Sequence, residues 1–143
     1  MHALLDQPRD VRSRDALDVP AVAAWLRDQL PGLSGTPRVQ QFRGGASNLT
    51  YLLVWPNQEV ILRRPPAGTK ASSAHDMGRE VRMLRALRHH YTALPAVLAW
   101  CQDPDVAGGE FYVMERIRGI ILRSDLPSQL GLDPRGTRKL CEN

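Results

Sequence analysis

Three β-forming segments in close succession constrain the fold of this chain more than any other feature. They span residues 38–42, 49–55 and 59–64, and short turn-forming stretches separate them. Connections this short favour antiparallel hairpin pairing between consecutive strands. Pro65 and Pro66 end the third segment, because proline lacks the backbone N–H that a strand uses in a sheet. The sequence therefore predicts an antiparallel meander at the centre of the fold.

A long amphipathic helix is predicted over residues 74–90. At about 100° per residue its apolar side chains form one stripe. The stripe consists of Met77, Val81, Met83, Leu84 and Leu87. Two further strands are predicted over residues 96–101 and 111–117, with a Gly-Gly turn between them. This order of elements predicts an α+β fold, in which a small antiparallel sheet of five strands carries one long helix.

The two ends of the chain carry weaker signals. Residues 1–17 show no sustained periodicity and are predicted to form a flexible leader. Asp18 suits a helix cap and Pro20 a first helical turn, so a helix is predicted over residues 18–32. Asp133, followed by a proline, carries the same signal and predicts the start of another helix.

Composition excludes several classes of protein. Hydrophobic residues make up 43% and charged residues 24% of the chain, as in globular domains. No apolar run approaches the roughly eighteen residues that span a bilayer, and the N-terminus has no signal-peptide core. Cys101 and Cys141 are too few for a disulfide framework or a zinc site. We therefore expect a cytoplasmic protein without a membrane partner.

The net charge of +4 raises the question of an anionic partner. Among the 19 basic residues only Lys70 and Lys139 are lysines, so arginine dominates. The planar guanidinium suits carboxylate and phosphate groups. The arginines are spread over the whole length, however, and aromatic residues, at 6%, are too few to form stacking platforms for bases. Binding of nucleic acid is therefore not expected.

Glu80 falls near the middle of the apolar stripe of the long helix. A carboxylate buried there costs several kcal/mol unless it finds a cation or hydrogen bonds. Arg63 is the candidate partner, because strand alternation places it on the same face as Ile61. In the alternative, Glu80 lies at the margin of the stripe and reaches water. The helical wheel leaves both possibilities open.

Two further segments are candidates for binding a ligand. The small residues of the loop 44–48 let backbone N–H groups approach an anion, and Ser47 adds a hydroxyl donor. This loop matches neither the dinucleotide-binding fingerprint nor the Walker loop, and it can equally be an ordinary turn. The segment 111–119 is either an ordinary exit from the sheet or a hinge whose backbone groups bind a ligand.

Four segments, in this order and spacing, together resemble the aminoglycoside-phosphotransferase-like kinases. They are residues 42–51 (FRGGASNLTY), 60–68 (VILRRPPAG), 78–81 (GREV) and 111–116 (FYVMER). The closest resemblance is to the branch that includes kinase domains fused to acyl-CoA dehydrogenases. It implies a protein-kinase-like N-lobe over residues 33–123. Residues 124–143 would then be a linker and the start of a truncated C-lobe.

The resemblance implies that ATP lies beneath the sheet. Gly44, Gly45 and Ser47 would belong to the loop that covers the phosphates. Arg63 stands where kinases place the strand-three lysine that touches the α- and β-phosphates, and Glu80 stands where they place its helix partner. Arginine in place of lysine is a departure from the pattern, since its fork is wider and its reach differs.

The adenine side of the site is implied in the same way. Met114 would lie beside the base, at the position of the kinase gatekeeper. The backbone of Glu115 and of Ile117 would form hydrogen bonds with the adenine edge.

A second departure concerns catalysis. The family carries a His-Gly-Asp-x-x-x-x-Asn segment and a later Asp, which orient the attacking hydroxyl and bind Mg²⁺. Nothing like these occurs in this sequence. The expected function is therefore that of the ATP-binding N-lobe of a small-molecule phosphotransferase, inactive alone. The alternative is a non-catalytic nucleotide-binding or interaction module. The acceptor hydroxyl compound is not determined by these residues.

An isolated N-lobe exposes the sheet face that would otherwise meet ATP and a C-lobe. Exposed apolar surface of this kind favours association. We therefore expect the chain to associate with itself.

Overall fold

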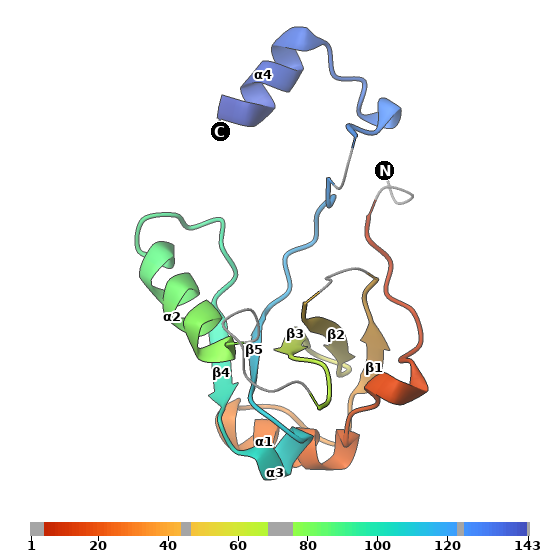
Figure 1. Ribbon diagram of the computed structural model, residues 1–143, viewed down its shortest axis with the longest axis vertical. Coiled ribbons are helices and arrows are strands. Elements are labelled where there is room, and N and C mark those ends of the chain that lie inside the picture. The colour runs from red at the N-terminus through yellow and green to blue at the C-terminus, as the bar shows by residue number, and fades with distance from the viewer. Residues whose placement is uncertain (1–4, 44–46, 69–75, 123–124, 143) are drawn as a thin grey trace. The chain divides into compact units, whose positions relative to one another are not determined.

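The computed structural model describes residues 5–43, 47–68, 76–122 and 125–142 (Figure 1). The chain forms two compact units, which are described separately. The larger comprises residues 7–117 and contains all five strands, and the smaller comprises residues 118–143 with residues 1–6.

The larger unit is built on a five-stranded sheet with the order β1-β2-β3-β5-β4 (Figure 1). Each pair of neighbouring strands is antiparallel. The strands are β1 (Arg38–Gln41), β2 (Leu49–Val54), β3 (Glu59–Arg64), β4 (Val97–Cys101) and β5 (Phe111–Glu115). The predicted meander corresponds to β1, β2 and β3. The two later strands are also found, and the predicted bounds differ only at the strand ends.

One face of the sheet packs against α1 (Val19–Gln29) and forms the main core. As predicted, Asp18 caps this helix, and its side chain accepts a hydrogen bond from the backbone N–H of Ala21 at 3.0 Å. Trp25 packs edge-on against Phe111, with ring centroids 5.3 Å apart. The short helix α3 (Pro104–Ala107), which sequence periodicity did not predict, contacts α1.

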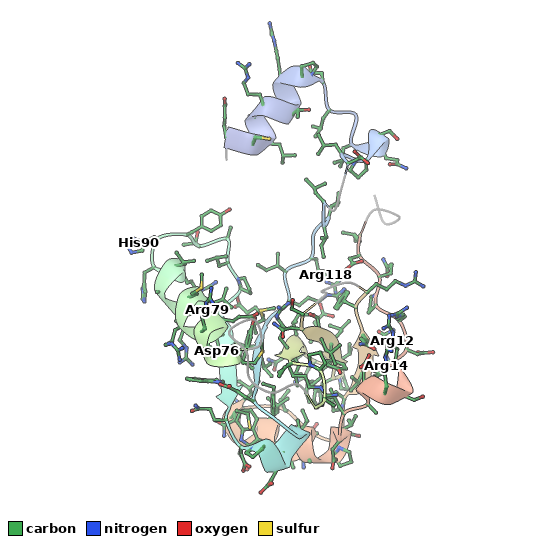
Figure 2. The ribbon with its side chains drawn as sticks, in the orientation of Figure 1. Arg12, Arg14, Asp76, Arg79, His90 and Arg118 are labelled. Carbon is green, nitrogen blue, oxygen red and sulfur yellow. The ribbon has the colours of Figure 1, made fainter. Side chains whose placement is uncertain are left out.

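The opposite face packs against α2 (Met77–Arg88), which lies along β4 and β5. Met77 and Val81 are fully buried there against Tyr112. Trp100, Leu84, Val97 and Met114 complete this second cluster. At the N-terminal end of α2, the Asp76 side chain accepts a hydrogen bond from the backbone N–H of Arg79 at 2.9 Å (Figure 2).

The predicted apolar stripe of α2 is too wide. Met83 and Leu87 are about half exposed, at 51% and 47%, whereas Met77 and Val81 are buried. The helix packs mainly on β4 and β5, so the side chains spaced by three or four residues from Met77 are the ones that reach the sheet.

The prediction of a flexible leader is wrong for residues 9–15. Arg9 pairs with Gln41 of the edge strand β1 through two backbone hydrogen bonds of 2.9 and 2.7 Å. A single turn of 3-10 helix follows (η2, Ser13–Asp15), and Asp15 is buried. The Gln41 side-chain amide donates to the Asp15 carboxylate at 2.9 Å. Val11 packs against the main core, but most of the contacts that hold the segment are polar and leave no hydrophobic periodicity in the sequence.

Arg64 of β3 forms hydrogen bonds with this N-terminal segment. Its buried guanidinium donates to the backbone carbonyls of Asp15, Ala16 and Ala107 at 2.9 to 3.0 Å. It also donates to the hydroxyl of Tyr51. Burial raises the pKa of Tyr51 above its ordinary value. Arg63 and Arg64 are consecutive in a strand and therefore point to opposite faces of the sheet.

The smaller unit contains α4 (Pro134–Glu142) and a 3-10 turn, η4 (Ser128–Leu130). The helix begins where the sequence predicts, since the Asp133 side chain accepts a hydrogen bond from the Gly136 N–H at 2.6 Å. Among the described residues of both units, no helix is long and apolar enough to cross a membrane.

Candidate functional site

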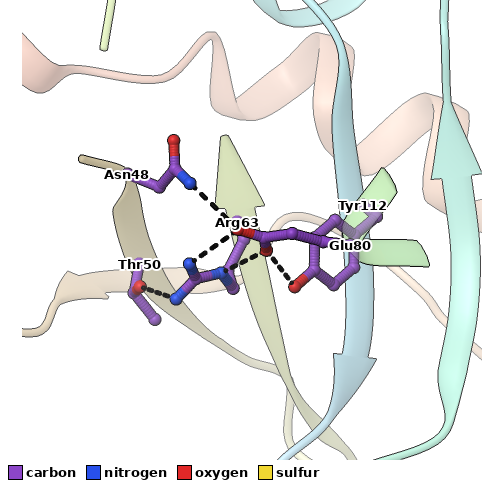
Figure 3. Close-up of polar contacts among 5 residues, drawn as sticks. All are labelled: Asn48, Thr50, Arg63, Glu80 and Tyr112. Carbon is purple, nitrogen blue, oxygen red and sulfur yellow. Dashed lines mark hydrogen bonds and ion pairs between the residues drawn. The ribbon is translucent and has the colours of Figure 1, made fainter. Parts of the chain in front are cut away.

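The candidate site lies on the face of the sheet that carries α2. Thr50, Arg63 and Tyr112 stand directly opposite one another on β2, β3 and β5. Residues paired in this way project from the same face. Glu80, from α2, meets them there (Figure 3).

Arg63 and Glu80 form a two-pronged ion pair. Arg63 Nε lies 3.0 Å from Glu80 Oε2, and Nη2 lies 3.2 Å from Oε1. The two side chains are 27% and 31% exposed, so water partly screens the pair. The pairing proposed from the helical wheel and strand alternation is therefore confirmed. Thr50 Oγ1 accepts a further hydrogen bond from Arg63 Nη1 at 3.3 Å.

Two further donors reach the same carboxylate. The Tyr112 hydroxyl donates to Glu80 Oε2 at 2.7 Å, and the Asn48 side-chain amide donates to Oε1 at 3.0 Å. Both Tyr112 and Asn48 are buried. Burial and, secondarily, the bond to Glu80 raise the pKa of Tyr112 far above its ordinary value. Tyr112 is therefore a neutral phenol that keeps its proton.

Sequence reasoning did not select Asn48, Thr50 or Tyr112 as site residues. Thr50 could have been found, because the turn after residue 55 sets the β2–β3 register and places it opposite Arg63. Tyr112 could not be found in this way. Its position depends on β5 pairing with β3, which is separated from it by a helix and another strand.

The predicted loop is described only at its end. Ser47 is exposed, whereas Asn48 directly after it is buried. Gly44 and Gly45 lie outside the described residues.

The predicted adenine-binding residues lie at and just beyond the end of β5. Met114 packs against the cluster beneath α2, and Ile117 is 56% exposed. The backbone N–H of Glu115 donates to the carbonyl of Ala96 at 2.9 Å. The Glu115 carboxylate accepts from the Ala96 N–H at 2.9 Å and lies 3.6 Å from Arg88. The backbone N–H of Glu115 is already bonded to Ala96. Only the backbone carbonyl of Glu115 can therefore form a hydrogen bond with an adenine base.

Arg63 can hold an anionic group in addition to Glu80. A guanidinium carries five N–H donors. Three of them serve Glu80 and Thr50. Two therefore remain for a ligand, as far as contacts with described residues go. A phosphate oxygen accepts such charge-assisted bonds well. Elsewhere in the described chain, no group of three or more His, Cys, Asp or Glu side chains is placed to hold a metal ion.

A model of the phosphotransferase enzyme family matches residues 38–143, which include every strand and the whole candidate site. The chain belongs to this family. A solved structure from Ralstonia eutropha, described as a candidate aminoglycoside phosphotransferase, is similar to the chain with a TM-score of 0.65 and 33% identity. The similarity covers 84% of the chain and 33% of that structure. The α+β fold is thus the N-lobe fold of kinase-like phosphotransferases.

Several relatives are much longer proteins. Mouse acyl-CoA dehydrogenase family member 10 is 36% identical over 135 residues, which are 94% of the chain and 12% of that protein. Rat acyl-CoA dehydrogenase family member 11 is 34% identical over 126 residues, 83% of the chain and 16% of that protein. The resemblance to phosphotransferases of the branch joined to acyl-CoA dehydrogenases is confirmed at the level of family.

Proposed function

We propose that the chain is the ATP-binding lobe of a phosphotransferase that moves the γ-phosphate of ATP to a hydroxyl of a small molecule. One observation carries the proposal. Glu80 holds Arg63 by two hydrogen bonds on the sheet face beside the end of the loop 44–48. The pairing fixes the guanidinium in place, while two of its N–H groups donate to no described residue and can serve a phosphate.

On the phosphate side, Arg63 contacts the α- and β-phosphates in this proposal. The Ser47 hydroxyl faces the phosphates from the end of the loop, and its exposure is consistent with that role. Glu80 offsets part of the charge of Arg63, which limits the cost of holding an unliganded cation in a half-buried position.

On the adenine side, the proposal uses the Met114 side chain, the carbonyl of Glu115 and the N–H of Ile117. The Glu115 carboxylate accepts a hydrogen bond from Ala96, the residue before β4, and pairs with Arg88 of α2. The strand that presents the adenine contacts is thereby tied to the helix that carries Glu80.

Transfer of the phosphoryl group requires an aspartate that orients the acceptor hydroxyl, together with carboxylate and amide ligands for Mg²⁺. The 143 residues contain no His-x-Asp-x-x-x-x-Asn segment that would supply them. We therefore propose that these groups come from residues outside this sequence, and that the 143 residues alone bind ATP without transferring phosphate.

The proposal is tested by comparing Glu80→Gln with Glu59→Gln in the natural protein that carries this sequence. Both carboxylates pair with an arginine, since Glu59 lies 2.7 Å from Arg116, and both are about 30% exposed. Glu80→Gln is expected to lower kcat/KM for ATP at least about tenfold, and Glu59→Gln to leave it nearly unchanged. Equal and small effects would contradict the assignment of the site. ATP binding with no transfer to any hydroxyl compound would favour the non-catalytic module.

A further inference from the structure

Each oxygen of the Glu80 carboxylate accepts two hydrogen bonds, one from Arg63 and one from another side chain. Oε1 accepts from Arg63 Nη2 at 3.2 Å and from Asn48 at 3.0 Å. Oε2 accepts from Arg63 Nε at 3.0 Å and from Tyr112 at 2.7 Å. A carboxylate offers about four acceptor sites. These four bonds therefore saturate it.

We propose that Asn48 and Tyr112 are positioning residues that hold Glu80 in one orientation, so that Arg63 is set for phosphate before the nucleotide arrives. This inference rests on the proposed function, because it explains how that site is assembled.

The argument begins with exposure. Arg63 and Glu80 are both more than a quarter exposed. An ion pair of this kind contributes little by itself, since water competes for it and two long side chains lose freedom when it forms. Asn48 and Tyr112 are only 4% and 2% exposed. Packing fixes the positions of their polar atoms. Their two hydrogen bonds therefore restrain the Glu80 carboxylate, which the exposed ion pair alone does not do.

The positions of the donors extend the argument to α2. Asn48 precedes β2, Arg63 lies on β3 and Tyr112 on β5. Donors from two strands and from the residue before β2 therefore converge on a single residue of the helix (Figure 3). Rotation or displacement of α2 would break all four bonds at once. The helix is consequently docked in the arrangement that presents Arg63.

The protonation of Tyr112 agrees with this role. Burial keeps its pKa far above neutrality, so the phenol remains a donor to the charged Glu80 over the physiological range. Asn48 adds a link to the loop, because it directly follows Ser47. The end of that loop and α2 are thus joined through one carboxylate oxygen.

Tyr112→Phe and Tyr51→Phe form a matched pair of variants. Both tyrosines are buried on strands, and each hydroxyl donates one short hydrogen bond. The Tyr51 hydroxyl donates to the carbonyl of Asp15 on the opposite face of the sheet. Each substitution therefore removes the hydroxyl of a buried strand tyrosine. The Tyr51 hydroxyl also accepts from Arg64, and only the Tyr112 hydroxyl touches Glu80.

The experiment measures two quantities in the 143-residue chain, the dissociation constant for ATP and the rate at which the Arg63 Nε–H exchanges with water in NMR spectra. Tyr112→Phe is expected to weaken ATP binding about tenfold, the size of one hydrogen bond to a charged group, and to speed the exchange. Tyr51→Phe should lower the midpoint of unfolding while leaving both quantities nearly unchanged. Asn48→Asp, which sets a second carboxylate against Glu80, should act like Tyr112→Phe.

The outcomes separate the two proposals. If the wild-type chain binds ATP and the two tyrosine variants behave alike, Tyr112 is merely structural and the inference is wrong. If the wild-type chain does not bind ATP, the proposed function fails and the inference falls with it, whatever the exchange rates show.

Discussion

Arginine at position 63 is the residue on which the account depends most. Its Nε and Nη2 face Glu80, and its Nη1 faces Thr50. A lysine ammonium has three donors on one atom and cannot hold a carboxylate by two prongs while also serving a hydroxyl and a phosphate. The bond to Thr50 thus uses a donor that a lysine could not spare.

Arg63→Lys is consequently a disruptive change at this site. We expect it to weaken ATP binding about tenfold, because one or two charge-assisted hydrogen bonds are lost. Arg85→Lys, on the exposed side of α2, is the matched control and should bind ATP as the wild type does. Titration of both variants with ATP measures the difference. Unchanged affinity in Arg63→Lys would show that the guanidinium fork is not used.

Part of this site was predictable from the sequence, because the positions of Arg63 and Glu80 depend on local structure alone. The position of Glu80 on its helix and of Arg63 on its strand follow from periods of 3.6 and 2 residues, which a sequence displays directly. Tyr112 reaches Glu80 only because β5 inserts beside β3, and Asn48 reaches it only because the chain turns before β2. Neither contact is encoded in a local period.

At the scale of the elements, Gly78 sets how closely α2 lies on β4. A Cβ at this position would meet Trp100 Cζ2 at 2.9 Å, a distance that requires something to move. Trp100 cannot turn away freely, since its indole N–H donates to Glu110 at 2.6 Å. The glycine is therefore required by the packing of the helix on the sheet.

Gly78→Ala is expected to destabilise the larger unit by about 1–3 kcal/mol, the usual cost of overpacking, even though alanine is the better helix former. Gly109→Ala is the control, because no atom of the described residues lies within 4 Å of its Cβ position. Urea unfolding of the two variants gives the comparison. A Gly78→Ala chain as stable as the wild type would mean that α2 is not closely packed on β4.

The N-terminal segment is one of the elements that sequence reasoning misjudged. Backbone pairing of Arg9 with Gln41 and the buried contacts of Asp15 hold it against the sheet. Polar contacts of this kind carry no hydrophobic period. The strands and α1, by contrast, were predictable because their alternation, turns and caps are local signals.

Deletion of residues 1–17 is expected to lower the free energy of unfolding by at least about 3 kcal/mol, because the buried Arg64 loses two of its carbonyl acceptors. Deletion of residues 1–6 is the control, since these residues lie outside the larger unit. Denaturant unfolding followed by tryptophan fluorescence measures both. If the two deletion variants have equal free energies of unfolding, the N-terminal segment does not stabilise the larger unit, and the prediction of a flexible leader is correct.

At the scale of the whole molecule, one compact unit of residues 7–117 contains the sheet, both packed faces and the ion pair. Its membership of the phosphotransferase family follows from the match over residues 38–143. Four sequence motifs indicate the same family, because their spacing reflects one three-dimensional site. The expected self-association of the chain stays a prediction.

The central claim is that this unit binds ATP through the face carrying Arg63 and Glu80, and mapping ATP-induced changes in the NMR spectrum of the 143-residue chain tests it most directly. The account predicts weak binding, with a dissociation constant of about a millimolar, because the phosphate and Mg²⁺ contacts that we assign to residues outside this sequence would not contribute. The changes should concentrate at Ser47–Thr50, Arg63 and Met114–Ile117, and Glu80→Gln should abolish them. Changes confined to other residues, or persisting unaltered in Glu80→Gln, would contradict it.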